Sequence, residues 1–338
     1  MWKRRWIGLL KTVCALLLLG WAFNQVGTES WSTLLSHRLQ LGWVMAGIGF
    51  GFLSVLGWAG RWYLLLRGIG IPVPFREIWR LTMIADFFNL YFLGPIGADG
   101  VRYAFLHRQA PNKRVELAST LVLDHIMGLQ ALVVAFVVFT FPHWSWIRGQ
   151  SENNIGLAGT IAATTILLFG AASGGVFWPI GRRIMNAALG WFKNRPTAKK
   201  GQELLTQIGD MSYSLWGALL VAAVSQASAY GAFWCAANAI QANISTPHLL
   251  AILPIIDAFA TLPITISGLG IREQFFLAAF GHGHGHGADG ALAVASSLLG
   301  FFFLGIWGMI GGIMLFLTKR AHPGRDLNRS GPRSELGL

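Results

Sequence analysis

Charged residues are scarce in this sequence. They make up 12% of its 338 residues, and only 14 are acidic, against 26 Lys and Arg. Hydrophobic residues account for 54%, which excludes a soluble domain of useful size. The formal charge of +12 could indicate nucleic-acid binding, but the basic residues form short clusters between apolar runs. That distribution is typical of cytoplasmic membrane loops and argues against a nucleic-acid partner.

Cysteine is nearly absent, and the common motifs of metal and cofactor sites are missing. Cys14 and Cys235 both lie in apolar runs, which favours two buried thiols over a disulfide. The alternation of Gly and His at 282–286 could hold a metal, but its glycines favour a loop and nothing supplies further ligands. No nucleophile elbow or nucleotide-binding loop is present. We therefore expect no metal, no cofactor and no enzyme activity.

Long hydrophobic runs are what the sequence has instead. Lys3, Arg4 and Arg5 precede the first run as in a signal sequence, yet no small-residue cleavage site follows, so we expect an uncleaved first helix. The runs predict an all-α polytopic integral membrane protein, with about eight hydrophobic segments in a single transmembrane domain over 1–318. The predicted long segments are 6–23, 42–66, 115–141, 155–180, 211–240 and 291–317, and the short ones are 81–93 and 248–262.

The two short segments are too short to cross a membrane comfortably. The 13 residues of 81–93 cover about 20 Å as a helix, against a hydrocarbon core of about 30 Å. If both short segments are re-entrant hairpins, six helices cross, and 22 of the 26 Lys and Arg lie in or beside cytoplasmic segments. Arg61 is one of the four exceptions and is expected to extend toward the inner end of its helix.

The alternative topology fits the charges less well. If both short segments cross fully, the loops at 102–114 and 181–200 move outside, with ten basic residues. We therefore predict two re-entrant hairpins in a protein of the cell inner membrane, with cytoplasmic N- and C-termini. The tail at 319–338 is basic and contains Gly and Pro, so we expect it to be disordered and cytoplasmic.

Two polar, Gly-rich turns interrupt the apolar sequence. In the first, Gly-Val precedes Arg102, and in the second, Gly-Ile precedes Arg272, so that a shift of 170 superposes the two motifs. Interrupted apolar segments in corresponding halves indicate a transporter-like binding site between internal repeats. Because each half, about 1–145 and 150–318, would contain three crossings, we expect the repeats to be inverted.

Each Gly-rich turn is predicted to open a helix whose first turn holds an arginine. A helix N-terminus presents unpaired N–H groups and suits a phosphate. Arg102 and Arg272 could each grip a phosphate with two parallel hydrogen bonds. In the simpler alternative, Asp99 only caps its helix and the arginines reach the interface or pair with Asp99 and Glu273. We favour an anion site because the arrangement occurs twice.

Several further polar residues lie within apolar segments. Asp86, Asn89, Asp124 and Asp257 could carry coupling protons, or could pair with the arginines across the repeat interface. Asp124 and His125 are neighbours on a helix and point about 100° apart, which favours separate packing roles over acid–base chemistry. The predicted substrate-binding residues are Asp86, Asn89, Gly97, Asp99, Gly100, Arg102, Asp124, Asp257, Ser267, Gly268, Gly270, Arg272 and Glu273.

Three motifs in order resemble the transmembrane region of lysylphosphatidylglycerol synthase, a flippase-like membrane family. They are Pro-x-Gly-Ala-Asp-Gly-x-Arg ending at Arg102, Leu-Asp-His-x-x-Gly from Leu123, and Pro-x-x-x-x-Gly-x-Gly-x-Arg-Glu ending at Glu273. The resemblance covers residues 6–318 and implies a lipid flippase. His125 stands where the family usually has Arg. No aminoacyltransferase domain follows in this sequence, so synthesis of lysylphosphatidylglycerol is not implied.

Together these features predict a flippase for an anionic phospholipid or lipid-linked headgroup, with membrane lipids as its partners. Two rivals stay open. An intramembrane lipid-modifying transferase would use Asp99, Asp124 or Asp257 as a base, but no catalytic motif supports it. A non-catalytic subunit of a lipid-modifying complex would leave the two arginines without a purpose.

Overall fold

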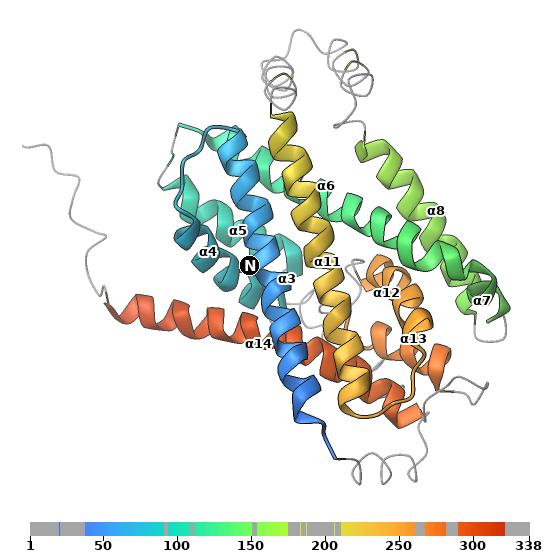
Figure 1. Ribbon diagram of the computed structural model, residues 1–338. Coiled ribbons are helices and arrows are strands. Elements are labelled where there is room, and N and C mark those ends of the chain that lie inside the picture. The colour runs from blue at the N-terminus through green and yellow to red at the C-terminus, as the bar shows by residue number, and fades with distance from the viewer. Residues whose placement is uncertain are drawn as a thin grey trace, which may run out of the picture.

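The computed structural model describes most of the predicted helical regions of the chain. The predicted first helix at 6–23, the Gly-His loop and the tail beyond 321 lie outside the described residues. Every secondary-structure element among those residues is a helix (Figure 1). Five helical stretches are long and apolar enough to cross a membrane, which confirms an all-α polytopic fold. The described residues are 38–90, 94–108, 110, 112–150, 154–174, 211–260, 268–281 and 290–321, with single positions 20, 183, 187 and 206.

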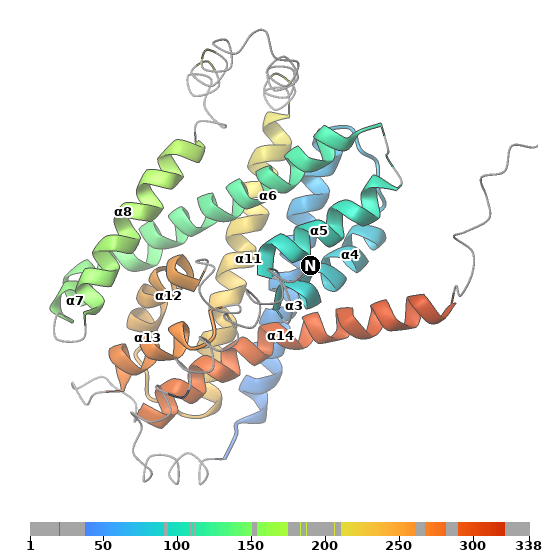
Figure 2. The ribbon, with the colours of Figure 1, turned by 180° about the vertical axis from the view of Figure 1, so that it is seen from behind.

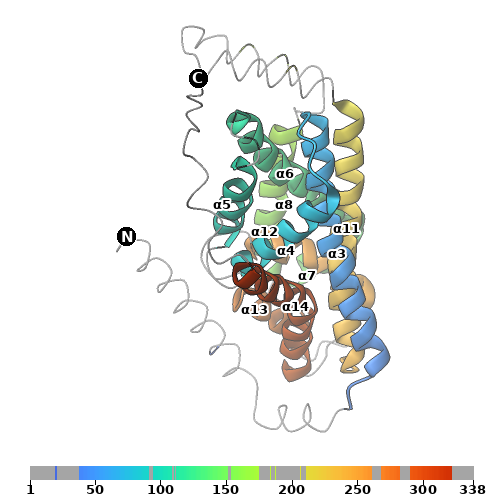
Figure 3. The same ribbon diagram turned by 90° about the vertical axis from the view of Figure 1, so that its left-hand side faces the viewer.

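Two long helices, α3 (Leu41–Gly68) and α11 (Ser212–Ala239), lie side by side and form one side of the fold in Figure 3 (Figures 1 and 3). They confirm the long helices predicted at 42–66 and 211–240. Each has 28 residues, or about 42 Å of helix, so their ends extend beyond a hydrocarbon core of about 30 Å. α11 begins 171 residues after the start of α3 and ends 171 residues after its end. Ser54 and Ser225 are also 171 residues apart. This separation is called the internal offset below.

The contacts between α3 and α11 show that the two helices are antiparallel. At one end, the backbone N–H of Gln40 donates to the carbonyl oxygen of Ala239 at 2.9 Å. Near the middle, the Ser225 hydroxyl donates to the carbonyl oxygen of Ser54 at 2.7 Å. A Cβ atom on Gly57 would lie 2.6 Å from that of Ser225. Small residues therefore let the two backbones approach closely, as is common in membrane helix pairs.

Two short helices follow the long ones. α4 (Phe75–Phe88) has 14 residues and α12 (Thr246–Ala260) has 15, and the internal offset also relates their first residues. The predicted range 81–93 is wrong at its start, because Pro74 has an extended backbone that ends the preceding loop, and α4 begins directly after it. The predicted range 248–262 is nearly right, since α12 begins two residues earlier.

The helices after the two breaks start differently from each other. α5 (Gly94–His107) begins at Gly94, which has a φ of 64°. Asp99 and Arg102 therefore lie in its second and third turns, and the prediction that they occupy the first turn is wrong. α13 (Ile271–Phe280) follows Gly270, so Arg272 does lie in a first turn.

The helix predicted at 115–141 continues further than expected. Pro142 falls at the start of a 3₁₀ turn, where its missing N–H costs little, so the chain stays helical to Gly149. Just before that turn, the Thr140 hydroxyl donates to the carbonyl oxygen of Ala251 at 2.7 Å across to α12. In chain order the elements are α6 (Arg114–Ala135), the π-helical turn η2 (Phe136–Thr140), the 3₁₀ turn η3 (Phe141–His143), α7 (Trp144–Gly149) and α8 (Ile155–Gly174).

The last helix, α14 (Gly290–Ala321), crosses the fold and packs on α4 (Figure 2). Glycines on α14 make this crossing close. A Cβ atom on Gly311 would overlap the backbone carbonyl of Met83, and one on Gly312 would lie 2.7 Å from the Phe87 ring. The α4–α14 contact therefore depends on the absence of side chains at these positions.

We expect Gly311→Ala to lower the free energy of unfolding by about 1–3 kcal/mol, because the backbone of Met83 cannot yield as a side chain could. Gly49→Ala on α3 is the matched control, since its Cβ would meet nothing within 4 Å. It should leave the stability equal or slightly higher. Denaturant unfolding in detergent measures both. Equal stability of the two variants would show that α4 and α14 are not closely packed at Gly311.

Candidate functional site

A buried ion-pair network joins three helices in the first half of the chain. The Asp124 carboxylate on α6 accepts from Arg61 Nε on α3 at 2.5 Å and from Arg102 Nη1 on α5 at 3.1 Å. Asp124 is 2% exposed and Arg102 is 7% exposed. Two guanidinium groups therefore share one carboxylate away from solvent. The prediction that Arg61 extends toward the inner end of its helix is wrong, because its side chain pairs with Asp124 instead.

Weaker contacts surround this network. Asp99 lies 4.0 Å from Arg102 Nη1, and its other oxygen is 3.6 Å from His125 Nε2. The Arg61 guanidinium lies against Gly128, where a Cβ atom would be 3.2 Å from Nη1. The Asp124 carboxylate is thus fully engaged in ion pairing, although His125 replaces the arginine that usually follows it in the family the sequence resembles.

The corresponding arginine in the second half has different surroundings. Arg272 is also 7% exposed, but none of the ion pairs among the described residues includes it. Its Nε and Nη1 atoms have no hydrogen-bond partner in the described part of the chain. The guanidinium instead lies between two aromatic rings, 5.1 Å from the centroid of Phe233 and 5.2 Å from that of Phe301. It is a buried cation whose Nε and Nη1 together leave three N–H donors without a partner among the described residues.

Glu273 does not neutralise this arginine, so the alternative pairing is wrong. One carboxylate oxygen of Glu273 accepts from the backbone N–H of Gly270 at 2.6 Å, and the other accepts from the Ser297 hydroxyl at 2.8 Å. Glu273 is 0% exposed and caps its own helix. The Gly270 N–H is therefore already used, and the guanidinium of Arg272 rather than the helix terminus is what could bind an anion.

The two predicted acids on the short helices also differ. Asp257 accepts a hydrogen bond from Gln226 Nε2 at 2.6 Å, and Arg272 is close enough for its charge to act on this carboxylate. Asp86 is 3% exposed, and neither of its oxygens has a hydrogen-bond partner among the described residues by distance and angle. Asn89 lies nearby. Asp257 is therefore held by Gln226, whereas Asp86 faces Gly308 of α14 and has Asn89 beside it.

The remaining predicted residues are mostly glycines with structural roles. Gly268 and Gly270 have φ values of 75° and 86°, which favour glycine whatever lies nearby. Gly97 is buried within α5, and Gly100 is exposed on it, with nothing within 4 Å of a Cβ atom. Ser267 lies outside the described residues. The structure therefore groups Asp99, Arg102 and Asp124 in one cluster and Asp257, Arg272 and Glu273 in another.

Sequence reasoning missed the residues that distinguish the two clusters. Arg61 carried a usable signal, because a charge within an apolar helix is itself a site hypothesis. The aromatic rings beside the two arginines carried no sequence signal that would have marked them as part of a site. The guanidinium of Arg102 lies 5.1 Å from the ring of Trp62, and that of Arg272 lies 5.1 Å from the ring of Phe233. The internal offset relates these two rings as well.

Comparison with known proteins agrees with this arrangement. The model of the lysylphosphatidylglycerol synthase transmembrane region matches residues 7–312. The chain belongs to this family. A UPF0104 membrane protein of Pyrococcus horikoshii is 27% identical over 141 residues, which cover 41% of this chain and 40% of that protein. This match spans about two fifths of the relative's length. The family assignment rests on the match of the family model to residues 7–312. Membership in the lysylphosphatidylglycerol synthase transmembrane-region family agrees with the all-α membrane fold.

Proposed function

We propose that this protein translocates a lipid with an anionic headgroup and binds that headgroup at Arg272. The observation that carries the proposal is the buried guanidinium of Arg272, which makes no ion pair within 4 Å among the described residues and whose Nε and Nη1 have no hydrogen-bond partner there. An unpaired cation at that depth is unfavourable by several kcal/mol unless an anion joins it. A phosphate fits, because the planar guanidinium can bind two of its oxygens at once.

The flanking aromatic rings support this assignment. Phe233 and Phe301 offer their faces to the cation, and such contacts contribute about 0.5–2 kcal/mol each, less than a charge partner would. They hold the guanidinium in place without satisfying its N–H groups. Arg272 is therefore positioned for a ligand that is anionic and compact.

The first half of the chain supports the same conclusion by contrast. Arg102 sits over Trp62 as Arg272 sits over Phe233, but Asp124 fills the place of a ligand there. The separation of 170 that relates the two arginines relates Asp124 to Val294, which has no carboxylate. An external anion at Arg272 would restore the charge balance that the first half achieves with its own side chain.

We further propose that the two halves are inverted repeats. The internal offset relates α3 to α11 at both ends, and the two helices run antiparallel. Ser54 and Ser225, which the same offset relates, contact each other where the helices cross. Contact between equivalent residues of antiparallel elements places a pseudo-two-fold axis at the crossing, in the plane of the membrane. Transporters with this symmetry alternate access by rocking one half against the other around a central site.

The short helices and the termini complete the proposal. α4 and α12 span about 21–23 Å as helices, less than the hydrocarbon core, so both are re-entrant in our topology. The N- and C-termini then face the cytoplasm of a bacterial-type inner membrane. Asp86, which is buried, is the proposed site where proton uptake couples to movement. No covalent chemistry is assigned to the protein.

Reconstitution tests translocation against its rivals. Vesicles containing the protein should move fluorescent phosphatidylglycerol between leaflets faster than protein-free vesicles, as measured by its exposure to an impermeant quencher. Arg76→Gln, an exposed α4 change, should behave like the unchanged protein. Recovered lipids should be chemically identical to those added. A modified lipid would indicate a transferase, and no movement in any lipid mixture would indicate a non-transporting subunit.

A further inference from the structure

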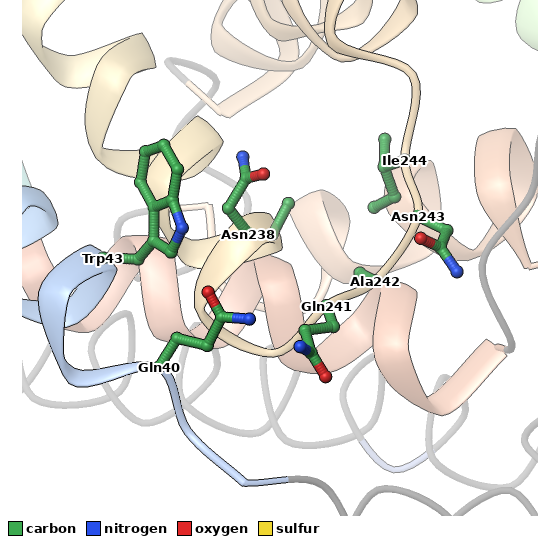
Figure 4. A pocket seen from close by; sticks show the side chains of 8 residues that line it. Gln40, Trp43, Asn238, Gln241, Ala242, Asn243 and Ile244 are labelled. Atoms are coloured by element: carbon green, nitrogen blue, oxygen red, sulfur yellow. The ribbon is translucent and has the colours of Figure 1, made fainter.

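A polar pocket of about 520 Å³ lies at one end of the α3–α11 helix pair (Figure 4). It is formed by the start of α3, the end of α11 and the loop between α11 and α12. None of its lining residues is charged, and four of them carry carboxamide groups around one indole ring. These five are Gln40, Trp43, Asn238, Gln241 and Asn243.

One of these carboxamides occupies a backbone position that normally belongs to glycine. Gln241 follows the C-cap of α11 and has a φ of 54°. Its N–H donates to the carbonyl of Asn238 at 3.1 Å, and the N–H of Ala242 donates to that of Ala237 at 2.9 Å. This pair of bonds is the Schellman ending of a helix, in which a left-handed residue closes the turn and glycine costs least.

The first half of the chain contains a natural comparison. α3 ends with the same pair of bonds, from Gly70 to Arg67 at 3.0 Å and from Ile71 to Leu66 at 2.9 Å. Gly70 has a φ of 73°, and the internal offset relates it to Gln241. The turn is thus made by glycine in one half and by glutamine in the other. The Gln241 side chain is not needed for the turn and is present despite a backbone cost.

Two other carboxamide side chains at the pocket are also not required by the backbone structure around them. Asn243 also has a positive φ of 50°, and the equivalent position in the first half is Pro72. Gln40 precedes α3 but its side chain makes no capping hydrogen bond. Carboxamides are therefore gathered here beyond what helix termination requires, at two positions against the conformational preference of the backbone.

We propose that this pocket binds a neutral polyhydroxyl group, the chemistry of a sugar. Each carboxamide offers both a donor and an acceptor, which matches neighbouring hydroxyl groups that also donate and accept. Trp43 adds an apolar ring and an N–H at the pocket wall. The absence of charge among the lining residues argues against an anion here. This site is independent of the anion site proposed at Arg272.

The position of the pocket fits such a ligand. The ends of the 28-residue helices α3 and α11 extend beyond the hydrocarbon core, so the pocket lies at the depth of lipid headgroups. Its ligand is therefore either a sugar carried on a lipid or a free sugar from the aqueous phase. Both share the hydroxyl chemistry, and titration with two probes separates them.

The test is calorimetric titration of the full chain in a polyoxyethylene detergent, since maltoside and glucoside detergents would themselves occupy the pocket. The probes are methyl β-glucoside and a dioctanoyl glucosyl glycerolipid. Gln241→Gly copies the glycine of the first half and removes only the side chain. We expect it to weaken binding about tenfold, with thermal stability equal or higher. Binding of dioctanoyl phosphatidylglycerol, the probe for Arg272, should not change.

Each outcome of the titration either supports or contradicts sugar binding in this pocket. Binding of either probe that is weakened by Gln241→Gly supports the pocket, and binding of the glycolipid alone identifies a lipid headgroup as the source. Gln40→Ala, at the start of α3, should weaken the same probe. No saturable binding of both probes, or equal affinity in Gln241→Gly and the unchanged protein, overturns the proposal. Neither result bears on the anion site.

Discussion

Arg272→Gln should weaken the binding of short-chain anionic lipids about tenfold to a hundredfold, since charge-assisted hydrogen bonds contribute roughly 1.5–3 kcal/mol. The same change should lower the stability of the ligand-free protein by less than Asp124→Asn does. The reason is that Arg272 makes no ion pair within 4 Å among the described residues, and its charge reaches the Asp257 carboxylate only over a longer distance. Loss of binding with little loss of stability separates a ligand site from a structural ion pair.

The binding measurement is a titration of the detergent-solubilised variants with dioctanoyl phosphatidylglycerol, alongside denaturant unfolding. Arg272→Lys should restore binding only in part, because an ammonium lacks the planar fork of a guanidinium. Arg76→Gln makes the same charge change at an exposed position and should not affect binding. If Arg272→Gln binds the lipid with the affinity of the unchanged protein, the guanidinium only packs against its aromatic neighbours and does not bind the headgroup.

The sequence singled out Arg102 and Arg272, which are both buried, but did not show how their surroundings differ. Arg102 and Arg272 follow nearly the same Gly-rich motif, so any local argument treats them alike. The difference comes from Arg61 and Asp124, which are 63 residues apart in the chain and meet at 2.5 Å. A contact between separate membrane helices depends on how they pack, and no local motif encodes it.

Helix boundaries near proline and glycine were predicted least well. The first short segment is predicted to begin at 81, whereas Pro74 ends the preceding loop and α4 begins at the next residue. Gly94 starts α5 earlier than expected and moves Arg102 into the third turn. The anion-binding argument from a helix N-terminus therefore fails for Arg102, and at α13 it is weakened because Glu273 already caps Gly270.

The internal echo was more informative than either motif alone. The internal offset of 171 relates the long helices, the starts of the short helices, and Asp86 with Asp257. Arg102 and Arg272 are separated by 170 residues instead. The second half is thus one residue shorter between Asp257 and Arg272. The sequence could reveal this correspondence, but the hydrogen bond between equivalent serines needed the packed helices.

Asp124→Asn should be the most destabilising change at either arginine cluster, lowering the free energy of unfolding by about 3–5 kcal/mol. Of the ion pairs that Arg61 and Arg102 make with described residues, only the 4.0 Å contact between Arg102 and Asp99 would remain. Denaturant unfolding in detergent measures the loss. Asp257→Asn is the matched control and should cost less, because its hydrogen bond is to the neutral side chain of Gln226.

A double variant shows whether the loss comes from the unpaired cations. Adding Arg61→Met to Asp124→Asn removes one of the two charges that Asp124 compensates, so the double variant should be more stable than the sum of the two single losses predicts. If the losses simply add, the ion pair between α3 and α6 contributes nothing measurable. If Asp124→Asn stays folded, Arg102 acquires the unpaired state of Arg272, and the protein should then bind a second anionic lipid at the first cluster.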